Sequence, residues 1–222
     1  MNIIEAMNAR HSVRKYTDKK IESDVLNELK AEIENCNRES GLNIQLITDD
    51  PDTFTGALAS YGSFKGVINY IALVGEKSDD LQEKVGYYGE KIVLKAQMLG
   101  LNTCWVALTF NKRKAKHKVN KGEKLVCVIS VGYGENNGKP HKSRLLDSLC
   151  CFHGDMPLWF MEGVLAAMTA PTARNQQKFL FTLVDKNKVK AEATGGFYSK
   201  VDLGIVKYHF ELGADKESFE FI

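Results

Sequence analysis

Two arginines and a serine near the N-terminus carry the clearest chemical signal in the sequence. Arg10, Ser12 and Arg14 alternate within the run Arg-His-Ser-Val-Arg-Lys-Tyr at residues 10–16. A guanidinium group offers a rigid fork of donors that matches phosphate oxygens, and serine adds a short hydroxyl donor. Because alternate residues of an extended segment share a face, we expect the three side chains to point one way and form a small anion site. The alternative is an ordinary cluster of solvated basic residues.

The run at residues 10–16 resembles the FMN-binding opening of the nitroreductase family. That resemblance implies contacts with the flavin phosphate and the pyrimidine edge of the ring for Arg10, His11, Ser12 and Arg14. His11 would act largely through its backbone, and Arg14 is the candidate for the positive charge near N1 and O2. Lys65 lies where some relatives place a polar or basic residue that reaches the flavin.

A bend in the second part of the chain supports the same resemblance. Residues 170–177, Ala-Pro-Thr-Ala-Arg-Asn-Gln-Gln, resemble the family's Pro-Ser-Ala-x-Asn-x-Gln-Pro bend, with Thr in place of Ser and no final Pro. In the family this bend crosses from the other subunit to the flavin ring. The resemblance therefore implies flavin contacts for Pro171, Thr172 and Asn175, whereas the alternative is a plain turn between a helix and a strand.

Two further stretches occur in the order that the family has. Residues 100–106 resemble its Gly-Leu-Gly-Thr stretch, which implies that the chain near Trp105 and Val106 approaches the flavin ring. Asn102 replaces a glycine there, and a core position is the alternative for Trp105. Gly132-Tyr133-Gly134 followed by Lys142 and Arg144 resembles the family's Gly-Tyr-Pro stretch and later basic pair, which implies that this pair closes on the flavin phosphate from the opposite side.

The bulk composition favours an ordinary globular protein. The chain has 222 residues, of which 44% are apolar and 26% are charged, and its net charge is +2. This charge gives no argument for binding nucleic acid or an acidic membrane, and no apolar run is long enough to span one. Five cysteines without metal-ligand spacing, and no visible secretory signal, lead us to expect a reducing cytoplasm, with neither a metal nor disulfides.

The elements that position these motifs follow from periodicity and from helix start and stop signals. We expect helices at residues 2–9, 23–38 with Ser23 as N-cap, 80–99 with Gly100 as the stop, 157–168, and 199–212 ended by Gly213. We expect strands at residues 42–48, 67–75, 101–108, 125–131, 179–184, 189–194 and 219–222. A short helix within residues 49–66 and a solvated helix and loop in the basic stretch at residues 111–124 complete this assignment.

A helix, strand, helix order occurs twice, which indicates a concealed duplication. The predicted fold class is α+β, and the resemblance implies a nitroreductase-like three-layer α/β/α sandwich with a mixed or antiparallel central sheet. Residues 1–150 form the first half in this prediction, and residues 151–222 form the second half, packed together as one compact unit. The resemblance implies a subgroup in which one chain supplies both halves of the usual dimer, as a pseudo-dimeric monomer or a homodimer.

The expected function follows from the resemblance. It implies an FMN-dependent oxidoreductase that uses NAD(P)H to reduce nitroaromatic, quinone or related acceptors by ping-pong hydride transfer through flavin N5, with no catalytic side chain assigned. The absence of a Gly-x-Gly-x-x-Gly motif agrees with a nicotinamide that stacks transiently. Three alternatives are a non-catalytic flavin-binding or redox-sensing protein, specialised chemistry such as flavin fragmentation or dehalogenation, and an α/β domain without a cofactor.

Overall fold

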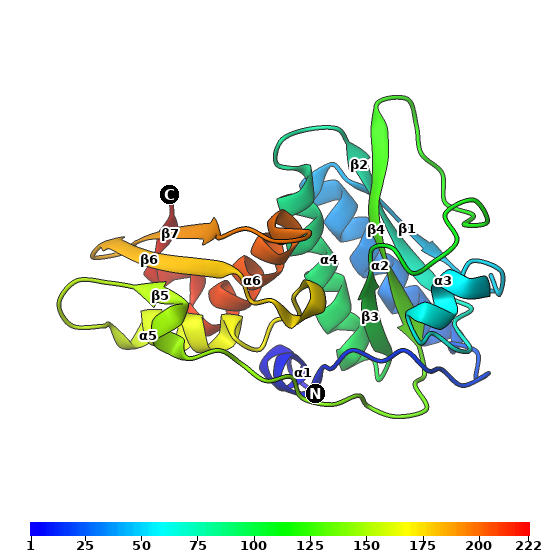
Figure 1. Cartoon of the computed structure of the whole chain (residues 1–222), viewed down its shortest axis with the longest axis horizontal. Coiled ribbons are helices and arrows are strands. Elements are labelled where there is room, and N and C mark those ends of the chain that lie inside the picture. The colour runs from blue at the N-terminus through cyan, green and yellow to red at the C-terminus, as the bar shows by residue number, and fades with distance from the viewer. The chain divides into compact units, whose positions relative to one another are not determined.

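The computed structural model describes all residues from Met1 to Ile222 and divides them into two units. Unit 1 contains Met1–Leu81 and Lys91–Pro140, and unit 2 contains Gln82–Glu90 and His141–Ile222. Within helix α4 (Leu81–Met98), which Figure 1 labels, residues Gln82–Glu90 belong to unit 2 and the others to unit 1.

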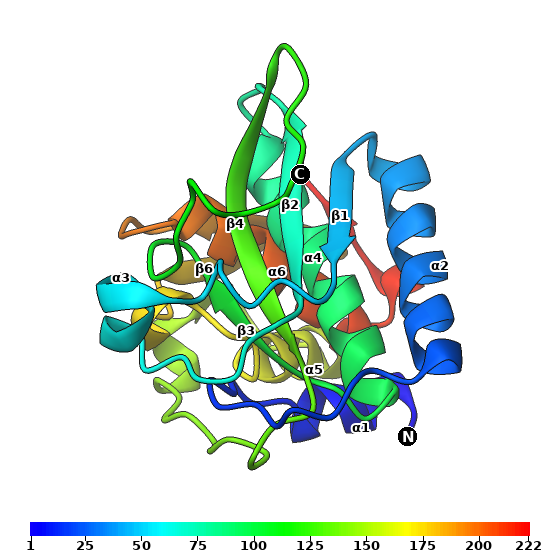
Figure 2. The same ribbon diagram turned by 90° about the vertical axis from the view of Figure 1, so that its right-hand side faces the viewer.

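Unit 1 is built on an antiparallel four-stranded sheet. Its other helices are α1 (Ile3–Ala9), α2 (Ser23–Ser40) and α3 (Gly56–Tyr61). Its strands are β1 (Asn43–Ile47), β2 (Tyr70–Glu76), β3 (Asn102–Val106) and β4 (Glu123–Gly132). The strand order is β1-β2-β4-β3, so β2 and β4 lie inside the sheet, and Figure 2 shows α2 running beside β1.

The sequence pattern explains why these elements bury the faces they do. Leu29, Ile33 and Cys36 recur at helical spacing and form the buried stripe of α2. Strand β2 is buried from Tyr70 to Gly75, as expected for a continuous apolar run flanked by strands on both sides. At the end of α4, Gly100 adopts φ +78°, the left-handed conformation that commonly follows a helix.

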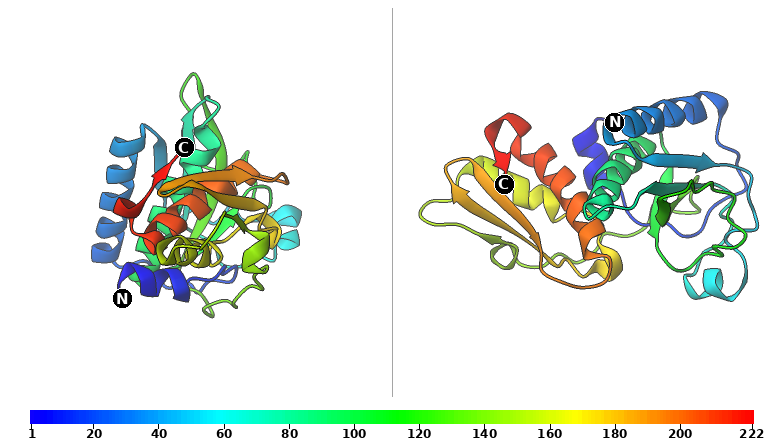
Figure 3. Two further views of the ribbon diagram at one scale, coloured as in Figure 1. Left: turned by 90° about the vertical axis from the view of Figure 1, so that its left-hand side faces the viewer. Right: turned by 90° about the horizontal axis from the view of Figure 1, so that it is seen from above.

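Unit 2 has a second, mixed sheet with two helices packed together. Its helices are α5 (Leu158–Ala167) and α6 (Ser199–Ala214), besides the first part of α4. Its strands are β5 (Cys150–Cys151), β6 (Phe179–Asp185), β7 (Lys188–Ala193) and β8 (Glu220–Phe221). The order is β5-β6-β7-β8, in which only the β6–β7 pair is antiparallel. In the view from above, α5 and α6 lie against these strands (Figure 3).

Aromatic rings and glycines determine how unit 2 packs. Phe181 of β6 stacks on Phe210 of α6 with ring centroids 4.5 Å apart, and Phe160 of α5 meets Phe210 edge-on at 5.8 Å. Gly204 of α6 lies so close to α4 that a Cβ atom would overlap the carbonyl oxygen of Glu83. Only glycine allows the two helix backbones to approach this closely.

The structure confirms the predicted α+β class and corrects several details. The strands belong to two separate sheets, and the two-residue strand β5 was not predicted. Glu22, rather than Ser23, is the N-cap of α2, and it makes no capping hydrogen bond with its side chain. Gly213 does not end α6, since the helix continues to Ala214. This glycine instead packs closely against the backbone of Glu162 in α5.

Two further observations concern the basic stretch and the helices. Residues 111–122 form turns and loop without a helix, in contrast to the helix and loop expected there.

The predicted division at residue 150 refers to the two halves of the usual family dimer, and it stays a prediction. None of the helices combines the length and apolar character needed to cross a membrane.

Candidate functional site

The N-terminal basic run is held in an extended conformation beside β3 of unit 1. Helix α1 begins with a capping box between Asn2 and Glu5 and ends at Ala9, and its C-cap Arg10 has an extended backbone. Ser12 then forms a parallel bridge with Thr103, and the Val13 amide donates to the Thr103 carbonyl at 3.0 Å. An extended backbone gives the alternation of side chains that the sequence predicted.

The three predicted anion-binding side chains all influence one buried thiol of β3, that of Cys104. Burial raises the pKa of the Cys104 thiol. Three effects oppose that shift, namely the charge of Arg14, a hydrogen bond with Ser12 and the charge of Arg10. Arg10 is 3% exposed, Ser12 is half-buried and Arg14 is exposed, so the cluster extends from the interior to the surface. Two guanidinium groups and a hydroxyl match the chemistry of a phosphate ligand.

Lys65 is brought to the same segment through its backbone. The Lys65 amide donates to the Arg14 carbonyl at 3.0 Å, and the Tyr16 amide donates to the Lys65 carbonyl at 2.9 Å. Its ammonium group is exposed and lies 3.3 Å from the Glu135 carboxylate. The next residue, Gly66, has φ +70°. A Cβ atom at this position would overlap the Tyr16 carbonyl oxygen, so the close approach of the two segments requires glycine.

The remaining predicted residues of unit 1 differ in how they face the sheet. The Val106 side chain is buried in the hydrophobic core together with Phe110 and Val128, which leaves its backbone for other contacts. Trp105 points to the other face of β3 and is half-buried. His11 is half-buried, and its Cβ lies against Gly138, where a side chain would not fit.

A second group of predicted residues is assembled within unit 2. The Lys142 carbonyl accepts hydrogen bonds from the side-chain amides of Asn175, at 3.0 Å, and Gln177, at 2.8 Å. The backbone N–H of Arg144 donates to Gln177 Oε1 at 2.9 Å, and the backbone N–H of Gln177 donates to Thr172 Oγ1 at 3.0 Å. The basic pair and the bend that starts at Pro171 are therefore joined by one network, while the Lys142 and Arg144 side chains stay exposed.

Gln177 and Asp202 organise this second group, although sequence reasoning gave neither residue a role. Gln177 is 2% exposed and holds four of the hydrogen bonds in the network. Asp202 is 3% exposed, and its carboxylate accepts from the Ala173 amide at 2.9 Å and from Gln176 Nε2 at 2.7 Å. An acidic residue between Val201 and Leu203 of an apolar helix was the available signal for Asp202.

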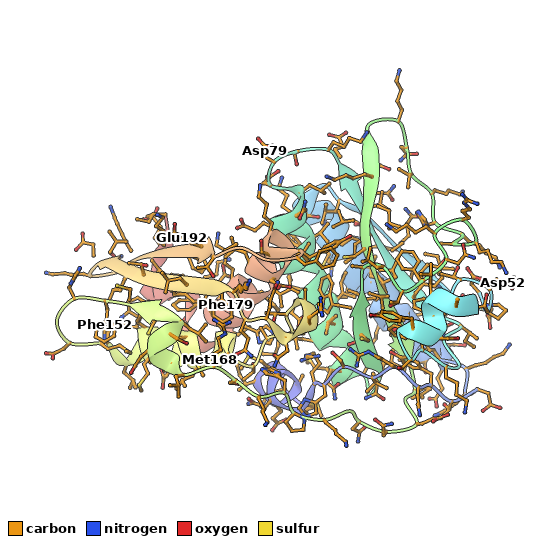
Figure 4. The ribbon with its side chains drawn as sticks, in the orientation of Figure 1. Asp52, Asp79, Phe152, Met168, Phe179 and Glu192 are labelled. Carbon is orange, nitrogen blue, oxygen red and sulfur yellow. The ribbon has the colours of Figure 1, made fainter.

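Met168, labelled in Figure 4, is the C-cap of α5, and Thr169 separates it from the bend at residues 170–177. Its carbonyl oxygen lies 2.9 Å from the Nε2 atom of His141, which starts the segment that carries Lys142. The end of α5, the bend and the basic segment are therefore fastened to one another.

A family profile described as "Putative TM nitroreductase" matches residues 2–214 of this chain. The chain belongs to this nitroreductase family. The match includes both groups of residues described above, from Arg10 in unit 1 to Asn175 in unit 2. Membership places the protein among the oxidoreductases. No protein with a curated function matches the sequence significantly.

Solved structures of nitroreductases share the fold of this nitroreductase family member. A "putative nitroreductase" from Thermotoga maritima MSB8 has a TM-score of 0.69 and 24% identity, over 98% of this chain and 85% of its own. A "putative nitroreductase in complex with FMN" from Desulfovibrio desulfuricans has a TM-score of 0.52 and 19% identity, over 67% and 95%. A "Putative NADH dehydrogenase/NAD(P)H nitroreductase" from Parabacteroides distasonis ATCC 8503 has a TM-score of 0.51 and 18% identity, over 67% of this chain and 97% of its own. At these identities the likeness concerns the fold.

Proposed function

We propose that this nitroreductase is an FMN-dependent enzyme that uses NAD(P)H to reduce nitroaromatic, quinone or related acceptors. The observation that carries the proposal is the extended N-terminal segment beside β3, whose Arg10, Ser12 and Arg14 all act on the Cys104 thiol, found in a member of a nitroreductase family. The FMN bound to a structural neighbour supports the choice of cofactor. When bound, FMN supplies the redox chemistry, with hydride acceptance at N5 followed by electron transfer to a second substrate.

The side chains of unit 1 bind and orient the cofactor in this proposal. Arg10 and Ser12 hold the phosphate, and the burial of Arg10 fixes its guanidinium before a ligand arrives, which lowers the entropy lost on binding. Arg14 provides positive charge for the pyrimidine edge, where negative charge develops on reduction. Lys65 supports Arg14 through the backbone hydrogen bond between them.

The bend of unit 2 contributes mainly its backbone. Both ends of the Asn175 side-chain amide are already engaged, with the Lys142 carbonyl and with Gln177. The Thr172 hydroxyl accepts a hydrogen bond from the Gln177 amide. We therefore assign to Pro171, Thr172 and Asn175 the role of shaping this bend, for which the family resemblance implies flavin contacts.

The oligomeric part of the proposal concerns residues 151–222. These residues supply what the second subunit supplies in dimeric members of the family. FMN binding by a particle of one chain mass, 24.8 kDa, in light scattering would support this assignment. FMN binding that appears only in a dimer would contradict it.

The test of the proposed function is FMN affinity, measured by quenching of flavin fluorescence. Arg10→Ala and Arg14→Ala each remove charge-assisted hydrogen bonds, so we expect FMN to bind roughly 10- to 100-fold more weakly. Arg10→Lys keeps the positive charge but loses the forked pair of donors. Its affinity for FMN should therefore lie between those of Arg10→Ala and the native protein. Arg38→Ala, on the exposed face of α2, is the matched control and should leave affinity unchanged.

Turnover distinguishes the enzyme from a flavin-binding protein without catalysis. The native protein with FMN should lose its visible flavin absorbance on addition of NADH or NADPH and regain it when a quinone follows. Retained FMN without such bleaching would favour the non-catalytic alternative. No FMN binding by the native protein would overturn the proposal altogether.

A further inference from the structure

The bend at residues 170–177 adopts an unusual backbone conformation for its sequence. Arg174, Asn175 and Gln177 have φ values of 55°, 53° and 45°. Residues other than glycine rarely adopt this left-handed backbone conformation, and they keep it only where the surrounding structure holds them in place. The bend therefore needs fixed supports from the rest of unit 2.

Asp202 provides one of these supports. It lies in the first turn of α6, and its two carboxylate oxygens accept one hydrogen bond each from the bend, from the Ala173 amide and from Gln176 Nε2. Gln176 also donates to the Phe197 carbonyl at 2.8 Å, which fixes the orientation of its amide. Gly196 leaves the space for this amide, since a Cβ atom there would overlap Gln176 Oε1.

We propose that Asp202 is a positioning residue, whose negative charge holds the bend in the conformation that the reaction requires. This inference rests on the proposed function, because it assigns a role to the bend beside the flavin. The carboxylate acts through Ala173 and Gln176 and touches no reacting atom. Losing its charge releases the bend and slows turnover while the rest of unit 2 stays folded.

The chemistry of the carboxylate explains why its charge matters. An ionised carboxylate only accepts hydrogen bonds, which suits two N–H donors. Protonation would remove the negative charge and weaken the hydrogen bonds that the two oxygens accept. Burial raises the pKa of Asp202 to about 6, against the opposing effects of Gln176 and Ala173. Asp202 therefore gains its proton within a pH range that the folded protein can meet.

Charged groups also lie on the elements around Asp202. Arg174 and Lys200 are the nearest cations in sequence, on the bend and on α6. Glu83 and Lys84 lie on the part of α4 packed against α6. The largest influence on the pKa of Asp202 is its burial, which the hydrogen bonds from Gln176 and Ala173 oppose.

The first test compares the pH dependence of kcat in the native enzyme and in Asp202→Asn between pH 5 and 8. A protonated, inactive fraction set by a pKa of about 6 predicts a native kcat about tenfold lower at pH 5 than on the plateau. Asp202→Asn should show the low rate without this pH dependence. Glu211→Gln, which removes another acid of α6 bonded to Tyr87, is the control and should keep the native profile.

A second variant moves the pH dependence instead of abolishing it. Gln176→Leu removes a hydrogen bond that lowers the pKa of Asp202, so the midpoint of the acid limb should move above pH 6. Gln176 is only partly buried, and leucine has a similar size, so the variant should fold. An unchanged acid limb in both variants, in an enzyme that turns over, would overturn the inference and leave the proposed function intact.

A measurement without flavin separates the two proposals. In the native chain without added FMN, the amide signal of Ala173 and the side-chain amide of Gln176 should titrate in NMR spectra with a midpoint near pH 6. If these signals titrate but FMN does not bind, the support by Asp202 stands and the proposed function fails. If they do not titrate, Asp202 does not control the bend.

Discussion

Replacing Asp202 by asparagine should change how the stability of unit 2 depends on pH. The pKa of Asp202 lies at about 6 in the folded protein, above its ordinary value of 3.8, chiefly because the side chain is buried. A group whose pKa is raised by folding contributes stability at low pH and loses it as the pH rises through the folded pKa. The native protein should therefore lose stability relative to Asp202→Asn between pH 4 and pH 7.

The size of this effect follows from the two pKa values. They differ by roughly two units, and each unit corresponds to about 1.4 kcal/mol, so the full effect is about 3 kcal/mol. Most of it lies between pH 4 and pH 7. All other titrating groups are common to both proteins, so the difference between their free energies of unfolding isolates Asp202. Any constant effect of the lost hydrogen bond cancels between the two pH values.

Urea unfolding followed by tryptophan fluorescence can measure this difference. Trp159 of α5 stacks on Phe219 within unit 2, and Trp105 belongs to unit 1. In a Trp105→Phe background the fluorescence therefore reports unit 2 alone. We expect the advantage of Asp202→Asn over the native residue to grow by about 2–3 kcal/mol from pH 4 to pH 7. A difference that stays constant over this range would refute the assignment of a raised pKa to Asp202.

Three further predictions concern other parts of the structure. Gln177→Ala removes three side-chain hydrogen bonds in a buried network, so unfolding of unit 2 should cost about 2–4 kcal/mol less in urea titrations, and an effect below about 0.5 kcal/mol would contradict its central place. Gly204→Ala forces a methyl group onto the backbone of α4, so it should lower the melting temperature by several degrees, whereas Ala214→Gly at the end of the same helix should have a smaller effect. Cys151 is the exposed thiol among five free cysteines, so one thiol per chain should react rapidly with a colorimetric thiol reagent in the folded protein, and none in Cys151→Ser.

The sequence was a good guide to elements whose signals are local. The stripe of Leu29, Ile33 and Cys36 predicted the buried face of α2, because helical spacing places these residues on one side. Gly100 predicted the end of α4, because glycine adopts positive φ at little cost. Gly213 shows the limit of the same rule, since packing against Glu162, rather than a helix end, explains the glycine there.

Sheet membership could not be predicted in the same way. Strand pairing joins segments far apart in the chain, and β5 is only two residues long, so its own sequence carries almost no strand signal. Single-sheet and two-sheet arrangements have the same local patterns. The pairing registers of the structure decide between them.

For the candidate site, the sequence alone determined the donor groups, and tertiary structure decided how they are supported. The alternation of Arg10, Ser12 and Arg14 is a local property, because an extended backbone sends alternate side chains to one face. The hydrogen-bond network of Gln177 and the raised pKa of Asp202 depend on burial and on partners brought from distant parts of the chain. Burial and desolvation exist only once the chain has folded, so no pattern of neighbouring residues could have fixed them.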